Sequence, residues 1–307
     1  MTPAPRPSES WPGEAVELPD RSMYVRHAPA TEPGAEPAVM VHGLGGSSMN
    51  WTDLMAALSD RLETWAPDLN GFGWSPPPRD GDYSPAGHAR GVAEVIEATA
   101  GGPVHLFGNS LGGAVCVQLA ARRPDLVRSL TLVSPALPSM RAQRGNVHLP
   151  VIAVPGVGES LVRRYLRVDA ELRARATIDA CFADPSRMSA DRMAEAVEEV
   201  RRRDSLPYLA DAFLSSLRGL MTTFVDRGPN RPWRLAERIG VPVLLVYGRT
   251  DKLVDPKAAH RATRHFRDAH VVLVPDSGHV AQMEHPELVA EAWRTFLGWR
   301  PAPAAPH

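Results

Sequence analysis

Ser110 is the residue whose surroundings most strongly indicate chemistry. It stands between Gly108 and Gly112 in the pattern G-x-S-x-G, after the apolar run VHLF and before an amphipathic stretch that begins LGGAV. A strand, a tight turn and a helix in this order project a serine hydroxyl above the edge of a sheet, and the turn leaves no room for side chains beside it. The N–H groups at the start of the helix point at negative charge that develops there. We predict that Ser110 is a nucleophile.

A serine nucleophile needs a base, and the base needs a carboxylate that orients it. His279 follows the apolar run HVVLV in the segment PDSGH, and Asp251 follows the run VLLVYG in the segment RTD. Both fall on loops at the carboxyl ends of predicted strands, which is the edge where Ser110 is also expected. The chain order Ser, Asp, His is the one expected on this architecture. We predict that Ser110, Asp251 and His279 form a catalytic triad.

A glycine-rich segment upstream supplies candidate donors to the developing charge. The apolar run at 38–41 leads into HGLGGSS, where glycines let a backbone amide approach a substrate oxygen closely. A phosphate-binding loop is disfavoured because neither G-K-[ST] nor G-x-G-x-x-G is present. His42 lies in the turn itself, and we expect it to make structural hydrogen bonds rather than to act as a base.

Short β-branched runs alternate with amphipathic stretches along most of the chain. Near-continuously apolar strands that alternate with helices favour a mostly parallel sheet covered on both faces. The predicted fold class is therefore α/β, with a twisted, mostly parallel sheet between helices. The strands are predicted at 38–41, 64–66, 104–107, 130–133, 243–247 and 270–274, and the helices at 51–59, 85–99, 111–121, 256–265 and 286–297.

The interval 136–233 interrupts this alternation. Its four periodic stretches, which begin GESLV, AELRA, SADRM and PYLAD, carry apolar residues at three- and four-residue spacing and predict helices. We predict an inserted helical cap or lid over 136–233, and a core formed by 21–135 and 234–300. Proline-rich sequence predicts a flexible leader at 1–20 and a flexible tail at 301–307.

Composition narrows the range of partners. With 34 basic and 35 acidic residues the net charge is −1, which gives no sequence-wide attraction to nucleic acid or anionic membranes. No run of about 18 apolar residues predicts a membrane span, and two cysteines are too few for a disulfide framework. No H-E-x-x-H or C-x-x-C pattern occurs, so we expect no metal and no cofactor. The prediction is a cytoplasmic protein that acts on a small molecule, with its oligomeric state open.

On these motifs the chain resembles the α/β-hydrolase superfamily from residue 21 to residue 300. The segments HGLGG, DLNGFGWS, GNSLGG, YGRTD and DSGHVAQMEHPE stand in the order and spacing of that group. The resemblance implies the same triad, and it implies an oxyanion hole formed by the amides of Leu44 and Leu111, with Gly43 as the alternative first donor. A serine at the nucleophile position departs from epoxide hydrolases and haloalkane dehalogenases, whose nucleophile is an aspartate.

Details of the motifs indicate which group of α/β-hydrolases the chain resembles most. The form GNS resembles that of C–C bond hydrolases that act on ring-cleavage products, but the first loop lacks their H-G-x-G-P-G form. Val280 and Met283 also stand where those enzymes often have tryptophans. We therefore predict a carboxylesterase or small lipase of the monoacylglycerol type, which cleaves esters with apolar groups through an acyl-enzyme. C–C hydrolysis of a vinylogous diketone, a cofactor-free haloperoxidase or perhydrolase, and a non-enzymatic ligand receptor or scaffold are the alternatives.

Candidate substrate contacts come from the loops and from the cap. For each of them, packing in the core is the competing role. They are Gly43, Met49, Trp51, Trp74, Met140, Leu149, Val151, Ile152, Val280 and Met283.

Overall fold

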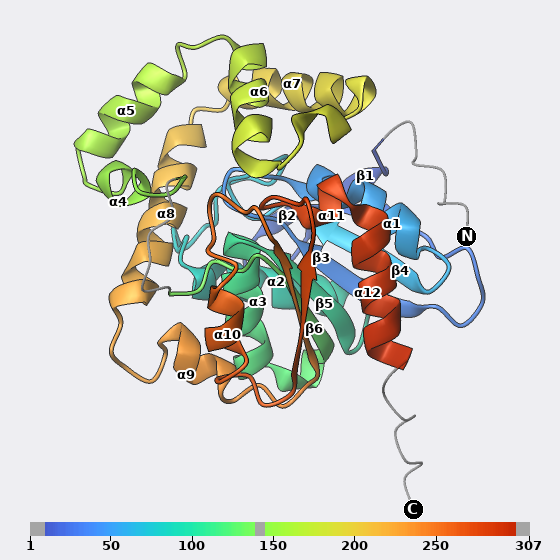
Figure 1. Cartoon of the computed structure of the whole chain (residues 1–307). Coiled ribbons are helices and arrows are strands. Elements are labelled where there is room, and N and C mark those ends of the chain that lie inside the picture. The colour runs from blue at the N-terminus through green and yellow to red at the C-terminus, as the bar shows by residue number, and fades with distance from the viewer. Residues whose placement is uncertain (1–9, 139–144, 299–307) are drawn as a thin grey trace, which may run out of the picture.

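The computed structural model describes residues 10–138 and 145–298 of the chain. A single eight-stranded sheet lies at its centre, with helices on both sides (Figure 1). The six strands β3 to β8 are parallel to one another, and β1 and β2 add an antiparallel edge. The predicted fold class is confirmed. In spatial order the strands are β1 (Gly13–Glu17), β2 (Ser22–Ala28), β4 (Leu62–Pro67), β3 (Glu36–Val41), β5 (Val104–Asn109), β6 (Val127–Val133), β7 (Val243–Gly248) and β8 (Ala269–Val274).

The antiparallel edge was not predicted. Strand β1 lies inside the segment 1–20, so the prediction of a flexible leader is wrong for Gly13–Glu17. This strand pairs along its whole length with β2, and a small apolar cluster around Met23 and Val25 anchors the edge against Val95 of the next layer. The prolines at positions 3, 5 and 7 suggested a flexible segment from its composition. The short strand β1 could not be predicted from that composition because it is stabilised by pairing with β2.

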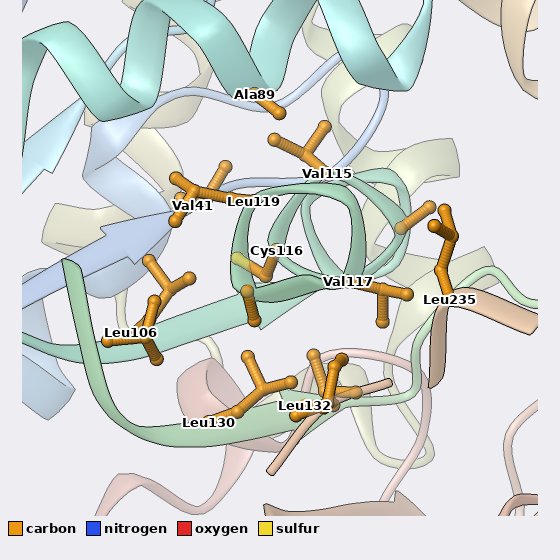
Figure 2. Close-up of a cluster of buried hydrophobic side chains, with 14 of the residues drawn as sticks. Val41, Ala89, Leu106, Val115, Cys116, Val117, Leu119, Leu130, Leu132 and Leu235 are labelled. Carbon is orange, nitrogen blue, oxygen red and sulfur yellow. The ribbon is translucent and has the colours of Figure 1, made fainter. Parts of the chain in front are cut away.

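Alternate residues of the central strands pack against different helix layers. Val39 and Val41 of β3 face helices α2 (Pro85–Thr99) and α3 (Leu111–Arg122), whereas Ala38 and Met40 face α1 (Thr52–Leu58) and α12 (Pro286–Gly298). Figure 2 shows the first of these clusters, in which Cys116 of α3 lies among apolar side chains of the sheet. The sheet is therefore covered on both faces, as the apolar strands predicted.

Two predicted helices differ from the structure. The segment 51–59 begins instead with a 3-10 turn over Ser48–Trp51 that leads into α1. The segment 256–265 forms only the short helix α10 (Ala258–Ala262), flanked by turns. In contrast, α2 matches its predicted bounds, and Ser84 caps it by accepting a hydrogen bond from the Gly87 amide at 3.1 Å.

Between β6 and β7 the described residues form helices and no strand. Most of these helices gather beyond one end of the sheet, with α5, α6 and α7 outermost in Figure 1. The last one, α9, packs on α3 and contributes Trp233 and Leu235 to the main core, so the boundary predicted at 233 falls inside a core helix. No helix in the described ranges has the length and apolar character needed to span a membrane. The helices are α4 (Leu149–Ile152), α5 (Val157–Tyr165), α6 (Ala170–Cys181), α7 (Ala190–Asp204), α8 (Leu209–Val225) and α9 (Pro232–Ala236).

Candidate active site

Ser110 occupies a strained turn between β5 and α3. Its backbone has φ 54° and ψ −117°, a conformation that a residue other than glycine rarely adopts. The glycines on both sides are required by space: a Cβ on Gly112 would lie 2.1 Å from the Val41 carbonyl oxygen, and one on Gly108 would lie 2.5 Å from the Gly112 carbonyl oxygen. The turn is held by neighbouring strands, since the Ser110 amide donates to the Val133 carbonyl at 3.1 Å. The predicted strand, turn and helix are all present.

The structure brings Asp251 and His279 together. The two residues follow β7 and β8, and their Oδ2 and Nδ1 atoms lie 3.0 Å apart with both side chains buried. The other carboxylate oxygen, Oδ1, accepts the amides of Leu253 and Val254 at 2.7 and 3.0 Å. Burial alone would raise the pKa of Asp251, but the charge and hydrogen bond of His279 and the two amides outweigh it and lower that pKa. An ionised Asp251 thus fixes Nδ1 as the protonated nitrogen and leaves Nε2 as a base.

Asn109 ties the His279 loop to the serine turn. Its side-chain amide donates to the His279 carbonyl at 3.1 Å and to the Val133 carbonyl at 3.0 Å. The hydrogen bonds of the described residues do not include one between the His279 imidazole and the Ser110 hydroxyl. Such contacts are often long before a substrate is bound. The backbone of His279 nevertheless lies next to the residue that precedes Ser110, as convergence of the predicted triad requires.

The first glycine-rich loop lies against Ser110. A Cβ on Gly43 would stand 3.1 Å from the Cβ of Ser110 and 3.2 Å from Oδ1 of Asn109. The Gly43 carbonyl accepts hydrogen bonds from His42 Nδ1 at 2.8 Å and from the Gly46 amide at 3.1 Å. Because a trans peptide points its C=O and N–H in opposite directions, these bonds orient the amide of Leu44. Leu111 begins α3, where an N–H has no partner within the helix.

His42 is held in a single neutral form. Its Nε2 accepts the Leu69 amide at 2.9 Å, so Nδ1 carries the proton that is donated to Gly43. A second proton would have to displace the Leu69 amide inside a site that water does not reach. Burial lowers the pKa of His42 to about 4, against a weaker opposing effect of the Gly43 carbonyl. His42 therefore acts as a support for the loop, which is the role expected from its place in the turn.

Acid should destabilise the protein through His42. Between pH 6.5 and about 4 the unfolded chain binds a proton at this position and the folded chain does not. The free energy of unfolding should therefore fall by about 3 kcal/mol over that window because of this residue alone. Urea denaturation at a series of pH values checks this, with His42→Gln as the variant that cannot titrate. Its stability should decline less steeply than that of the wild type, and identical slopes would contradict the prediction.

Glu284 is a site residue that sequence reasoning missed. Its wholly buried carboxylate joins the His279 loop to the helical insertion. Oε2 accepts the Gly278 amide at 2.7 Å, and Oε1 accepts the amides of Ala183 and Asp184 at 2.9 and 2.8 Å. The His279 amide in turn donates to the Cys181 carbonyl at 2.6 Å. The histidine loop is thus built directly on the end of α6. The signal in the sequence is a glutamate five residues after the histidine, in the short segment between His279 and Pro286.

Glu284→Gln should destabilise the fold and lower the activity. A glutamine has one acceptor oxygen, so its NH₂ group must face the amide of Gly278 or those of Ala183 and Asp184. Loss of hydrogen bonds to a charged group costs about 2 kcal/mol, which lowers the melting temperature by several degrees. Differential scanning calorimetry measures this, with the exposed Glu291→Gln of the next helix as the matched control. Equal melting temperatures for the two variants would show that the carboxylate does not support the loop.

Helix α7 ends over the two loops beside the serine. Arg203 donates to the Gly45 carbonyl at 2.6 Å, and Arg202 donates to the Gly73 carbonyl at 2.7 Å. The guanidinium of Arg202 also lies 3.9 Å from the ring centre of Trp74, which is 53% exposed. Trp74 therefore borders the junction between the core and the insertion, and its contact with a substrate stays a prediction.

The predicted substrate contacts fall into different environments. Trp51 is wholly buried between α1 and the sheet with its ring edge against Phe107, so it is a core residue and its prediction as a substrate contact is wrong. Val151 is half exposed on α4. Val280 packs with Ile178 and Phe182 at the end of α6, and Met283 adjoins this cluster. The half-buried Met49, Leu149 and Ile152 stay predictions, and Met140 lies outside the described residues.

Within residues 10–138 and 145–298, no group of three histidine, cysteine or acidic side chains is arranged to hold a metal ion. Both cysteines in this part of the chain are free. Burial raises the pKa of Cys181 to about 12, with a further contribution from the charge of Asp251. A thiol of this kind is a poor nucleophile. Ser110 stays the predicted nucleophile.

The chain is similar in sequence and in fold to known hydrolases. A family model described as alpha/beta hydrolase fold matches residues 37–286. The chain is 30% identical over 268 residues to 2-(acetamidomethylene)succinate hydrolase of Mesorhizobium japonicum, which covers 87% of this chain and 90% of the relative. It is 27% identical over 272 residues to pimeloyl-[acyl-carrier protein] methyl ester esterase of Neisseria meningitidis, with 84% and 91% covered. The crystal structure of Cfl2 from Burkholderia cenocepacia shares the fold, with a TM-score of 0.78 at 21% identity over 92% of this chain and 95% of that one.

Proposed function

The chain belongs to the α/β-hydrolase family, and from this premise we propose that it is a serine hydrolase that cleaves carboxylic esters with apolar groups. The observation that carries the proposal is the buried pair of Asp251 and His279, whose atoms Oδ2 and Nδ1 lie 3.0 Å apart. The loop that carries His279 is tied by Asn109 to the Ser110 turn. A carboxylate, an imidazole and a hydroxyl at one edge of the sheet are the groups that acyl transfer requires.

The reaction proceeds in two halves. Ser110 Oγ attacks the ester carbonyl while His279 Nε2 accepts the hydroxyl proton, and Asp251 stabilises the resulting imidazolium. The amides of Leu44 and Leu111 hold the oxyanion, a contribution of about 3 kcal/mol per donor in comparable sites. The alkoxide leaves with the proton from His279, which gives an acyl-enzyme. Water then attacks the acyl group and gives a proton to His279, which returns it to Ser110 Oγ as the acid product leaves.

Two of the relatives support acyl chemistry. One is named as a methyl ester esterase and the other as a hydrolase of a substituted succinate, and each aligns with more than four-fifths of this chain. We propose that the helical insertion serves as a cap that excludes water and limits the size of the acyl group. Its contacts with the Gly45 and His279 loops support this role.

Arg203 favours a second candidate, hydrolysis of a C–C bond in a vinylogous diketone acid. Such a substrate needs a basic group of the cap near its carboxylate. Arg203 is such a group, since its side chain is nearly buried, reaches the Gly45 carbonyl of the first loop and lies 3.8 Å from Glu199. This reaction uses either Ser110 or a water molecule activated by the same triad as its nucleophile. The two candidates therefore differ in substrate and not in the triad.

A substrate panel separates the candidates. We expect p-nitrophenyl esters of graded acyl length to be hydrolysed with a higher kcat/KM than a vinylogous diketone acid, and Arg203→Met to leave the neutral esters the better substrates. A preference for the diketone acid that is lost in Arg203→Met would favour C–C hydrolysis instead. Turnover of neither class by folded protein would contradict both.

A further inference from the structure

An apolar surface is exposed on the outer helices of the insertion. Among the described residues, thirteen large apolar side chains are exposed, and eight of these lie between positions 147 and 172. Single exposed apolar residues are normal on a protein surface, whereas a contiguous group marks a site of interaction. The eight residues are 41–60% exposed and comprise Val147, Val151, Val154, Val157, Leu161, Tyr165, Val168 and Leu172.

Helix α5 carries the centre of this surface, and its position explains why the surface is open. Val157, Leu161 and Tyr165 are spaced four residues apart and form one stripe along the helix. Gly158 lies about 100° around the helix from Val157, on the side that packs against the protein, and a Cβ there would lie 2.9 Å from the Leu214 side chain of α8. Arg218 of α8 also pairs with Glu159 at 2.8 Å. Figure 1 shows α5 at the periphery, away from the sheet.

The same helix carries basic side chains. Arg163 and Arg164 lie in its last turn, and Arg167 follows in the turn after it; all three are exposed. No side-chain hydrogen bond or ion pair engages any of them among the described residues, whereas the acidic Glu159 of this helix is paired with Arg218. Arg164 is three residues after Leu161, so it extends from the same face as the apolar stripe. This face therefore combines exposed apolar groups with uncompensated positive charge.

We propose that this face of α5, with the adjoining residues of α4 and α6, docks on the surface of an anionic phospholipid bilayer. An amphipathic helix with arginines beside its apolar face lies in the interface, with the apolar side chains inserted about 5–10 Å and the guanidinium groups at the phosphates. The net charge of −1 for the whole chain does not oppose this, because the attraction acts over about a Debye length from the helix.

A second copy of the chain fits this face less well. Pairing two such faces would leave the arginines of both copies without an acidic partner on α5, because Glu159 is already paired with Arg218. A lipid surface supplies both an apolar layer and negative charge. The proposal does not depend on the reaction that the protein catalyses, and it is tested without an activity assay.

Vesicle flotation tests the docking. The full chain should float with vesicles of phosphatidylcholine and phosphatidylglycerol at low salt, and less with phosphatidylcholine alone. Val157→Asp with Leu161→Asp should abolish flotation, and Arg164→Gln should lower the partition coefficient roughly fivefold. Leu288→Asp, an equally exposed position on α12, is the matched control and should float like the wild type. All substituted side chains are exposed, so melting temperatures should stay unchanged.

Three outcomes would overturn the proposal. The first is that folded wild-type protein does not float with the anionic vesicles at low salt. The second is that the double aspartate variant floats as well as Leu288→Asp. The third is that light scattering shows a dimer that the double variant converts to a monomer, which would make a second copy the occupant of this face.

Discussion

Ser110→Ala is expected to lower kcat for ester hydrolysis by about 10⁶-fold while the protein stays folded. The loss is this large because the hydroxyl is the group that bonds to the substrate. Alanine has the same Cβ as serine, so position 110 can keep its φ of 54°. The substitution also leaves the hydrogen bond from the backbone amide of residue 110 to the Val133 carbonyl, and the packing against Gly43, unchanged. Steady-state kinetics together with the melting temperature measure the two effects separately.

Ser134→Ala provides the control for this change. Ser134 also has a positive φ of 43°, directly after the neighbouring strand β6, and its buried hydroxyl has no hydrogen-bond partner among the described residues. Its removal should leave kcat near the wild-type value. If Ser110→Ala retained a kcat comparable to that of Ser134→Ala, Ser110 would not be the nucleophile.

Asp251→Asn is expected to lower kcat by about 10⁴-fold. The amides of Leu253 and Val254 both donate to Oδ1 of Asp251, so the oxygen of the asparagine should occupy that position. Its NH₂ group then faces Nδ1 of His279, which must become the acceptor and leaves the proton on Nε2. An imidazole in this tautomer cannot take the proton of the serine hydroxyl. Kinetics at neutral pH measure the effect.

The nearby Asp255 supplies the matched control. It lies four residues further along the same loop, and its Oδ1 caps a turn by accepting the Lys257 amide at 3.0 Å. Asparagine caps as well as aspartate does, so Asp255→Asn should have kcat close to that of the wild type. Similar losses in both variants would mean that the loop, rather than the orientation of His279, sets the rate.

The sequence was sufficient to predict the pair Asp251 and His279 because parallel strands bring their carboxyl ends to one edge. Each residue lies in the loop after an apolar run, and the structure shows those runs as adjacent strands β7 and β8. The glycines around Ser110 were informative for a similar reason, since close approach of the backbone excludes every other residue there. Local patterns of this kind carry long-range information only because the sheet is regular.

Contacts between the insertion and the core could not be predicted. Glu284 binds amides of residues 183 and 184, about a hundred positions away, and no periodicity encodes that distance. Arg203 belongs to a run of three arginines at 201–203, and the run itself does not indicate that one of them binds the first loop. The whole-chain charge likewise conceals the local excess of arginine on α5. Trp51 shows the opposite error, because nearness to the first loop in sequence does not distinguish the core side of a helix from the substrate side.

The insertion is therefore connected to both halves of the site. The Cys181 carbonyl at the end of α6 accepts the His279 amide, and Arg203 of α7 binds the Gly45 carbonyl. In the proposed function, the insertion would support the loops that carry Gly45 and His279 as well as cover them. Substitutions at the ends of α6 and α7 are thus expected to alter kcat in addition to substrate binding.

Labelling with a fluorophosphonate probe tests the central claim most directly. The probe reacts with a serine only where a base and an oxyanion hole activate it. Digestion with trypsin releases residues 91–122, a peptide in which Ser110 is the only serine. We expect mass spectrometry to find the adduct on Ser110 in the wild type and in Ser134→Ala, and to find none in Ser110→Ala. Folded wild-type protein that stays unlabelled, or that carries the adduct on another residue, would contradict the assignment of this site.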